Sequence, residues 1–357
     1  MRWQRSEQTA AIPMRSVGPV KIIGSEVNAE VMVPLATFET PLWPSTHRGA
    51  VVTRHAGGIR AIVIDERMTR SILLEADTIV LAHETVAAIL RYKETMQAII
   101  AETSRFAYLL DMHSQLVGNL IYLRFEYRTG DAAGHNMVTL ATDRLLTWIM
   151  ERFPHLKYVS ISGNYCSDKK AGAVNGILGR GKHVITEVTI SEELCRQFLK
   201  STPEKIVQLN IKKNLLGNIV AGSIRTANAH FANMLLGFYL ATGQDAANII
   251  EGSQGIVHAE VKNTDLYFTV TLPNIIVGTV GNGKTHGFVR DNLQALGCLE
   301  ARLPGQNARR LAIIAASAVL CGELSLLAAQ TNPGELMKSH IKLERQQAKR
   351  GAELCLK

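Results

Sequence analysis

Residues 71–161 constrain the fold more than any other segment, because strand and helix patterns follow one another there in a fixed order. Short apolar runs at 71–76, 106–110, 116–127 and 158–161 are typical of strands, the middle two being joined by a polar turn. Apolar residues at helical spacing predict helices over 79–102 and 131–153, the second ended by Pro154. The resulting strand–helix–strand–strand–helix–strand order is the ferredoxin-like, split βαβ arrangement.

We therefore expect an α+β protein, with a small ferredoxin-like domain at 71–161 inserted into a larger domain formed by 1–70 and 162–357. The larger part should contain strands at 30–36, 59–64, 257–261 and 267–272. Helices are expected from Ser191, over 224–248, and from Asn332, which is followed by Pro333. The 357 residues suit two or three domains at about 150 residues each.

Composition limits the protein class. Apolar residues make up 46% and charged residues 20%, which excludes disorder, collagen and coiled coil. No signal peptide is visible, and the longest apolar run, 311–322, is too short to span a bilayer. The five cysteines contain no C-x-x-C pair, which argues against disulfides and a structural zinc site. We expect a cytoplasmic protein with neither a metal nor a membrane partner.

A net charge of +8 favours a polyanionic partner, either a nucleic acid or a phosphate-rich cofactor. The sequence GTVGNGKT at 278–285 even satisfies the P-loop pattern. Only about seventy residues follow it, and they lack an apolar strand ending in Asp to hold magnesium, which argues against a nucleotide triphosphatase. The glycines still allow backbone N–H groups to approach a phosphate or a flat ring.

Four polar clusters interrupt apolar stretches: Glu39, the Asp168–Lys170 run, Asp245 and His340. Each has a structural explanation when taken singly: a turn carboxylate, a surface charge cluster, a helix cap and an exposed helix face, respectively. Spacing along the chain does not assemble them into one site.

Ordered motifs across roughly residues 12–345 resemble the biosynthetic class of 3-hydroxy-3-methylglutaryl-CoA (HMG-CoA) reductases. They are VPLATFE, STHRG, MTR, TSRF, GDAAGHNM, SGNYCSDKK, NIKKNLLG, NAHFAN, GQDAAN, GTVGNG, GELSL and LMKSH. The resemblance implies a four-electron reduction of the HMG-CoA thioester to mevalonate and free CoA by two hydrides from NADPH. It also implies a ferredoxin-like cofactor domain and an active site built from two chains, so a homo-oligomer is expected.

The resemblance assigns roles to four residues. Lys169 matches the lysine that stabilises negative charge on the carbonyl oxygen, and Glu39 matches the proton-donating glutamate. Asp245 matches the aspartate between them, and His340 matches the histidine that protonates the departing CoA thiolate.

Binding residues carry over from the same motifs. Those matching the hydroxymethylglutaryl site are Arg70, Ser162, Asp168, Lys170, Lys213 and Asn233. Those matching the CoA-contacting neighbourhood are Ser45, His47, Arg48, His230 and Ser325. Those matching the dinucleotide site are Ser104, Arg105, Asp131, Ala132, Ala133, Gly134, His135, Asn136, Met137, Val280, Gly281 and Asn282. The Ser104–Arg105 pair favours NADPH over NADH, because a hydroxyl and a guanidinium suit the 2′-phosphate. The phosphates of CoA and NADPH also account for the basic charge.

Several positions depart from the family pattern. Thr40 and Pro41 replace Gly and Cys beside Glu39, His47 replaces an Asn, and Asn282 replaces a glycine. A homologous NADPH-dependent reductase of another acyl-CoA or carrier thioester is therefore the alternative function. A nucleic-acid-binding protein is a third hypothesis, but no basic patch interleaved with aromatic residues supports it.

Overall fold

The computed structural model describes residues 9–338 and residue 341, and it is a mixed α and β structure. Its larger sheet has the strand order β2-β1-β3-β7-β9-β8. Of these strands, β1 and β3 pair in parallel and the other neighbours are antiparallel. The bounds are β1 (Met14–Ile23), β2 (Asn28–Ala36), β3 (Ile59–Glu75), β7 (Gly181–Ile190), β8 (Ile256–Lys262) and β9 (Asp265–Ile275).

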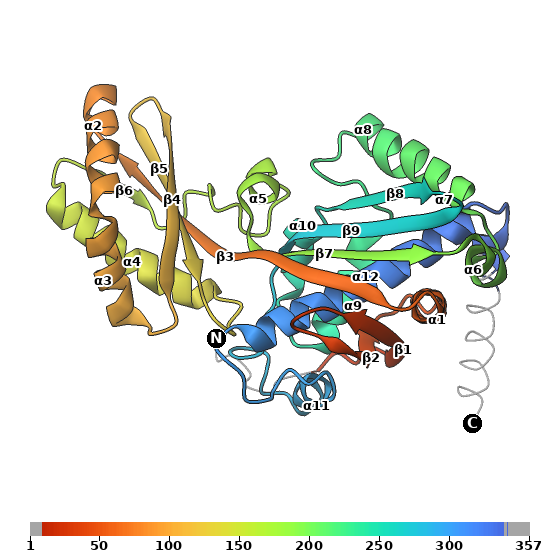
Figure 1. Ribbon diagram of the computed structural model, residues 1–357. Coiled ribbons are helices and arrows are strands. Elements are labelled where there is room, and N and C mark those ends of the chain that lie inside the picture. The colour runs from red at the N-terminus through yellow and green to blue at the C-terminus, as the bar shows by residue number, and fades with distance from the viewer. Residues whose placement is uncertain (1–8, 339–340, 342–357) are drawn as a thin grey trace, which may run out of the picture.

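A second group of strands pairs with the far half of β3, in the order β4-β5-β3-β6, and every pair in it is antiparallel. Helices α2, α3 and α4 stand beside these strands (Figure 1). The elements are α2 (Ile79–Ile89), the turn η1 (Leu90–Tyr92), α3 (Lys93–Thr103), β4 (Tyr108–Val117), β5 (Leu120–Arg128), α4 (His135–Arg152) and β6 (Lys157–Ser160).

One long strand, β3, runs through both halves of the molecule (Figure 1). Residues 60–67 pair with β7, and from Met68 onward the strand pairs with β5. The sequence predicts two separate strands here, at 59–64 and 71–76, because polar residues lie between them. The polar stretch is instead the part of β3 that passes from one hydrophobic core to the other.

The larger core is built around α12 (Gln306–Gln330), which packs on α1 (Leu42–His55), α9 (Phe231–Ala241) and β7. The apolar run 311–322 is part of the longer helix α12, which by length and composition could span a membrane. Its most apolar window is 94% buried inside the protein, as in a core helix. The remaining helices and helical turns are α5 (Ala173–Leu178), α6 (Glu192–Leu194), η2 (Cys195–Leu199), α7 (Pro203–Leu209), η3 (Asn210–Gly217), α8 (Asn218–Val220), η4 (Ala246–Asn248), α10 (Ile249–Gly252) and α11 (Gly287–Ala295).

Three predicted elements were wrong in extent. The helix over 79–102 is broken at η1, where Tyr92 leaves helical geometry and packs edge-on against Trp148. The polar residues predicted to form a turn before residue 116 belong to β4 instead. β4 is an edge strand, so its polar side chains can face solvent. The turn that joins β4 to β5 lies at Gly118 (φ +58°). The helix over 224–248 shrinks to α9, because Glu323 binds the N–H groups just before Phe231 and ends the irregular segment there.

Gly49 allows α1 and α12 to approach closely, because a Cβ there would lie 2.0 Å from the carbonyl oxygen of Cys321. We predict that Gly49→Ala lowers the free energy of unfolding by about 3 kcal/mol, the upper end for overpacking, since the clash is with backbone. Urea denaturation followed by circular dichroism measures the loss. Gly287→Ala is the matched control, because a Cβ at Gly287 meets nothing within 4 Å. Equal stability of the two variants would contradict the close approach.

Candidate functional site

A lysine–aspartate pair lies where the loop after β6 meets the segment after α9. Lys169 Nζ is 2.7 Å from Asp245 Oδ2, and the two side chains are 37% and 41% exposed. The hydrogen bond to Asp245 raises the pKa of Lys169. The pKa of the Asp245 carboxyl is lowered: burial acts to raise it, but the hydrogen bond from Lys169 and the nearby charges outweigh burial. The ammonium and the carboxylate therefore both stay charged near neutral pH, and the ammonium remains partly open to a ligand.

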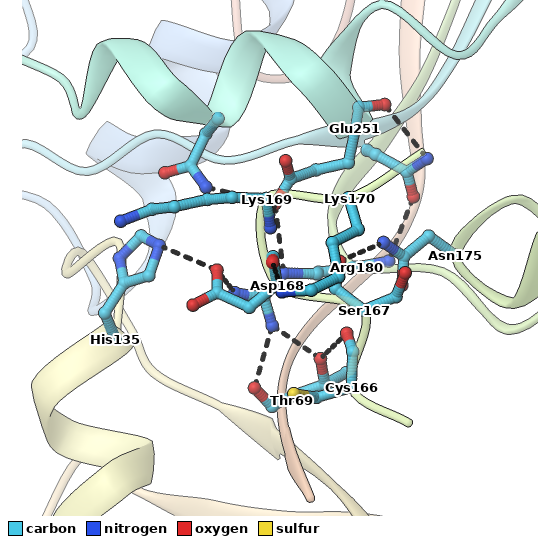
Figure 2. Close-up of polar contacts among 12 residues, drawn as sticks. Thr69, His135, Cys166, Ser167, Asp168, Lys169, Lys170, Asn175, Arg180 and Glu251 are labelled. Atoms are coloured by element: carbon cyan, nitrogen blue, oxygen red, sulfur yellow. Dashed lines mark hydrogen bonds and ion pairs between the residues drawn. The ribbon is translucent and has the colours of Figure 1, made fainter. Parts of the chain in front are cut away.

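A buried charge network holds the Lys169 loop from below (Figure 2). Arg180, only 1% exposed, donates to Asp168 Oδ1 (2.5 Å) and to Glu251 Oε1 (3.3 Å). The same Glu251 oxygen accepts the backbone N–H of Lys169 at 3.0 Å. Arg180 also donates to the hydroxyl and carbonyl oxygens of Thr69 on β3. The network therefore ties the loop to β3 and α10.

Sequence reasoning missed both Arg180 and Glu251. Burial raises the pKa of Glu251, and Arg180 opposes that rise. The available signal was a charged residue between Gly179 and Gly181, directly before an apolar strand. A surface arginine is the more frequent reading of such a pattern, so the tertiary contacts were needed to see it.

The Glu39 carboxylate lies at a different place from the Lys169–Asp245 pair. Glu39 Oε2 accepts a hydrogen bond of 2.7 Å from Asn233 Nδ2, in the first turn of α9. Asp245 follows the other end of α9, which spans about 12 Å from Asn233 to Ala241 at 1.5 Å per residue. Within residues 9–338, no hydrogen bond or ion pair links Glu39 to Lys169 or Asp245. His340 lies outside the described residues.

The residues expected at CoA gather between α1 and α12. Arg48 donates to Ser325 Oγ (3.0 Å) and to the Ser325 carbonyl oxygen (2.6 Å), while Ser45 and Ser325 share a hydrogen bond of 3.0 Å. His230 Nδ1 lies 2.6 Å from buried Glu323, two residues before Ser325. Burial lowers the pKa of Lys213, opposed by the nearby Glu323. His47 is exposed on the same helix as Ser45.

Other residues expected at the substrate lie along β3 and the loop after β6. Arg70 belongs to β3, and its buried Nε has no hydrogen-bond partner among the described residues. The Ser162 N–H donates to Ser160 Oγ at 3.0 Å, just after β6. Lys170 Nζ donates to the carbonyl oxygen of Asp168 at 2.9 Å and is otherwise exposed. The unpartnered Arg70 donor leaves a free position for an acceptor group.

Two loops expected at the dinucleotide lie against each other. Ala132 and Val280 form a parallel bridge, and the Thr279 N–H donates to the Asp131 carbonyl oxygen at 2.8 Å. A Cβ at Gly278 would lie 2.3 Å from the Ala133 nitrogen, so only glycine allows this approach. The Asp131 carboxylate is turned to α12, where it accepts the N–H groups of Gly305 and Ala308. The Asp131 side chain therefore stabilises the start of α12.

The other dinucleotide residues border this pair of loops. Gly134, with φ +100°, precedes α4, which begins with His135, Asn136 and Met137. Gly281 and Asn282 are exposed beside Val280. Ser104 is half-buried, and the neighbouring guanidinium of Arg105 stacks on Phe106, whose ring packs against Gly130. Segments 104–105, 131–137 and 280–282 are therefore neighbours.

Asp111, His113 and Glu126 are the one group of possible metal ligands among the described residues, and they lie on β4 and β5. Glu126 is already paired with the guanidinium groups of Arg67 and Arg124. Two guanidinium groups beside the buried carboxylate repel a cation, so the cluster suits an ion-pair network.

The geometry as a whole defines a class of enzyme. A fixed ammonium beside a carboxylate can stabilise an oxyanion, and a glycine loop against a helix start can accept a phosphorylated cofactor. Carbonyl reduction by a dinucleotide is one chemistry that uses both. Comparison with known proteins places the chain within this class.

The profile of the hydroxymethylglutaryl-coenzyme A reductase family matches residues 8–345, so the chain belongs to that family. The 3-hydroxy-3-methylglutaryl-coenzyme A reductase of Aeropyrum pernix is 42% identical over 336 residues, which are 94% of this chain and 79% of that protein. The Pyrococcus abyssi enzyme is 44% identical over 321 residues, 89% of this chain and 78% of its own.

Solved structures show the same fold. The class II 3-hydroxy-3-methylglutaryl-CoA reductase from Streptococcus pneumoniae, bound to NADPH in open conformations, superposes with a TM-score of 0.73 at 19% identity. The superposition covers 92% of this chain and 87% of that one.

Arg180 provides a test of the buried network. We predict that Arg180→Met lowers the free energy of unfolding by about 3–5 kcal/mol, because it leaves Asp168 and Glu251 without their cation. Arg196→Met, which breaks only the exposed pair with Glu192, should change it by less than about 0.5 kcal/mol. Urea denaturation of both variants makes the comparison. A loss as small for Arg180 as for Arg196 would show that the network does not stabilise the loop.

Proposed function

We propose that the protein is an NADPH-dependent HMG-CoA reductase, which reduces the thioester of HMG-CoA to mevalonate and releases free CoA. The observation that carries the proposal is the Lys169–Asp245 pair at 2.7 Å, partly open to a ligand. NADPH supplies the two hydrides when it is bound. Cytoplasm is proposed as the location of the protein, since Cys166, Cys195, Cys298 and Cys321 are all free thiols.

Lys169 is the proposed oxyanion-stabilising residue. Reduction of a carbonyl builds negative charge on its oxygen, and a positioned ammonium offsets that charge. The buried Arg180–Glu251 network limits how far the loop can move, so little reorganisation is needed at the moment of reaction. Asp245 keeps the ammonium protonated and oriented.

Glu39 and His340 are the proposed proton donors. Glu39 is exposed, and Asn233 orients one of its carboxylate oxygens toward the start of α9. A carboxylic acid can deliver a proton to the alkoxide formed at each reduction. An imidazolium can protonate the departing CoA thiolate, because the conjugate thiol has a pKa of about 8.5. That role is proposed for His340 from the family resemblance.

The substrate is proposed to lie between the two parts of the molecule. The free Nε of Arg70 suits the carboxylate of the hydroxymethylglutaryl group, because arginine binds carboxylates through charge-assisted hydrogen bonds. The proposed further contacts of that group are Ser162, Asp168, Lys170, Lys213 and Asn233. The proposed contacts of CoA are Ser45, His47, Arg48, His230 and Ser325, of which all except His47 gather around the α1–α12 contact.

We infer that residues 71–161 form an inserted ferredoxin-like domain that binds the dinucleotide, and that residues 1–70 and 162–357 form the HMG-CoA domain. The β4-β5-β3-β6 order and the separate core of the small part support the division. The fit to a dinucleotide rests on the glycine contact at Gly278 and on the start of α4, where N–H groups lack helical acceptors. The guanidinium of Arg105 supports a 2′-phosphate, hence NADPH.

A homo-oligomer is proposed, with the active site shared between two chains. The Glu39–Asn233 and Lys169–Asp245 pairs lie toward opposite ends of α9, so a second copy could bring complementary ends together. Leu216, Ile219 and Val220 also present an exposed apolar face at helical spacing, with Val220 88% exposed. Lys213 lies on the same helical stretch, so the face adjoins the proposed site.

Turnover tests the proposed reaction. Oxidation of NADPH by the wild-type protein with HMG-CoA should yield mevalonate, and a panel of other acyl-CoA thioesters should react more slowly. We predict that Lys169→Met lowers kcat by about 10²–10³, as for loss of an oxyanion donor. Lys157→Ala, which removes only an exposed pair with Asp77, is the control. A faster reaction with another thioester would identify a different substrate, and unchanged kcat in Lys169→Met would refute the mechanism.

The apolar face tests the assembly. Val220→Lys should shift the native mass of the protein toward the 39.1 kDa of one chain, because a charge is placed in the middle of the interface. Light scattering during gel filtration measures the mass. The matched control is Val117→Lys, a 63% exposed valine at the end of β4 in the other part of the molecule. A wild-type mass of one chain would contradict the shared site.

A further inference from the structure

His135 is the one ionisable side chain that α4 directs at the Lys169 loop. It is the first residue of α4, directly after the left-handed Gly134, and its imidazole lies beside Asp168 (Figure 2). His135 Nε2 is 3.9 Å from Asp168 Oδ1, too far for a hydrogen bond. That nitrogen is buried and has no hydrogen-bond partner among the described residues.

A buried ring nitrogen without a partner requires an explanation, because leaving such a group unsatisfied is costly. The near oxygen of Asp168 is already bound by Arg180 at 2.5 Å. His135 therefore faces the reacting centre with one unused hydrogen-bonding position. Because the imidazole can donate or accept at Nε2, a ligand group of either kind could fill it.

The surrounding charges indicate which ligand group fits. Burial and the Arg180 guanidinium lower the pKa of His135 to about 4, with Lys169 acting in the same direction and with Asp168 and Asp245 opposing. The imidazole is thus neutral at physiological pH. A phosphate would favour a charged imidazole, whereas a carbonyl or hydroxyl oxygen suits a neutral one. Such an oxygen is present in the acyl part of the substrate, next to Lys169.

We propose that His135 is a substrate-binding residue whose Nε2 hydrogen-bonds an uncharged oxygen of the acyl group held between Asp168 and Lys169. The proposal rests on the function proposed above, and it assigns the His135 side chain to the acyl group instead of the dinucleotide. The backbone of residues 131–137 stays available to the dinucleotide. The small part of the molecule thereby contributes a side chain to acyl recognition.

Isothermal titration with HMG-CoA and, separately, with NADPH tests the proposal without requiring turnover. His135→Met fills the space but cannot donate from this position, so the Kd for HMG-CoA should rise about three- to tenfold, the value of one neutral hydrogen bond. The Kd for NADPH should stay within about twofold of wild type, which is less than the loss of one such bond would produce. His135→Gln places an amide nitrogen near the Nε2 position and should recover most of the affinity, whereas His135→Asn should not.

His258→Met, on the exposed side of β8, is the matched control for loss of a histidine. Circular dichroism and native mass confirm that each variant folds. An unchanged Kd for HMG-CoA in His135→Met, or a rise in the Kd for NADPH alone, would overturn the proposal. Failure of the wild-type protein to oxidise NADPH with HMG-CoA would instead count against the proposed function, and the two Kd values would still report on the contact.

Discussion

The position of the Lys169 loop depends on one buried cation. Arg180 binds Asp168, Glu251 and Thr69, three groups that belong to different parts of the chain. A buried guanidinium is tolerated only where carboxylates and carbonyl oxygens satisfy it, so its partners have little freedom to move apart. Glu251 in turn binds the Lys169 N–H. The Lys169 loop is therefore held by a network whose central groups, Arg180 and Glu251, are buried.

The second constraint is the strand β3, which belongs to both cores. Its first half pairs with β7 and its second half with β5, and the change occurs between Arg67 and Met68. Thr69, next in the chain, is a partner of Arg180. The passage between the two cores thus lies beside the site. Residues from both parts, His135 from one and Asp168 from the other, meet there because the strand is continuous.

Local patterns predicted the order of the elements in the small part of the fold, but not all of their bounds. The order of strands and helices over 71–161 follows from alternating and helical spacing, and pairing in the structure agrees with that order. The extent of α9 could not be read in the same way. Its start depends on Glu323, more than ninety residues away along the chain, which captures the N–H groups of Ala229 and His230. A polar run in an edge strand, at Asp111–Gln115, misled for a similar reason, since burial there is set by the neighbouring strand.

For the site, Lys169, Asp245, Glu39 and Asn233 were predicted from the family resemblance, because the motifs that contain them match the family pattern. The sequence did not show which of these residues contact one another. Glu39 meets Asn233 because α9 packs on β2, and Lys169 meets Asp245 where the loop after β6 reaches the segment after α9. The buried partners Arg180 and Glu251 and the unpartnered nitrogen of His135 emerged only from the packed fold. Burial and hydrogen-bond satisfaction depend on neighbours distant in the chain, so no local pattern encodes them.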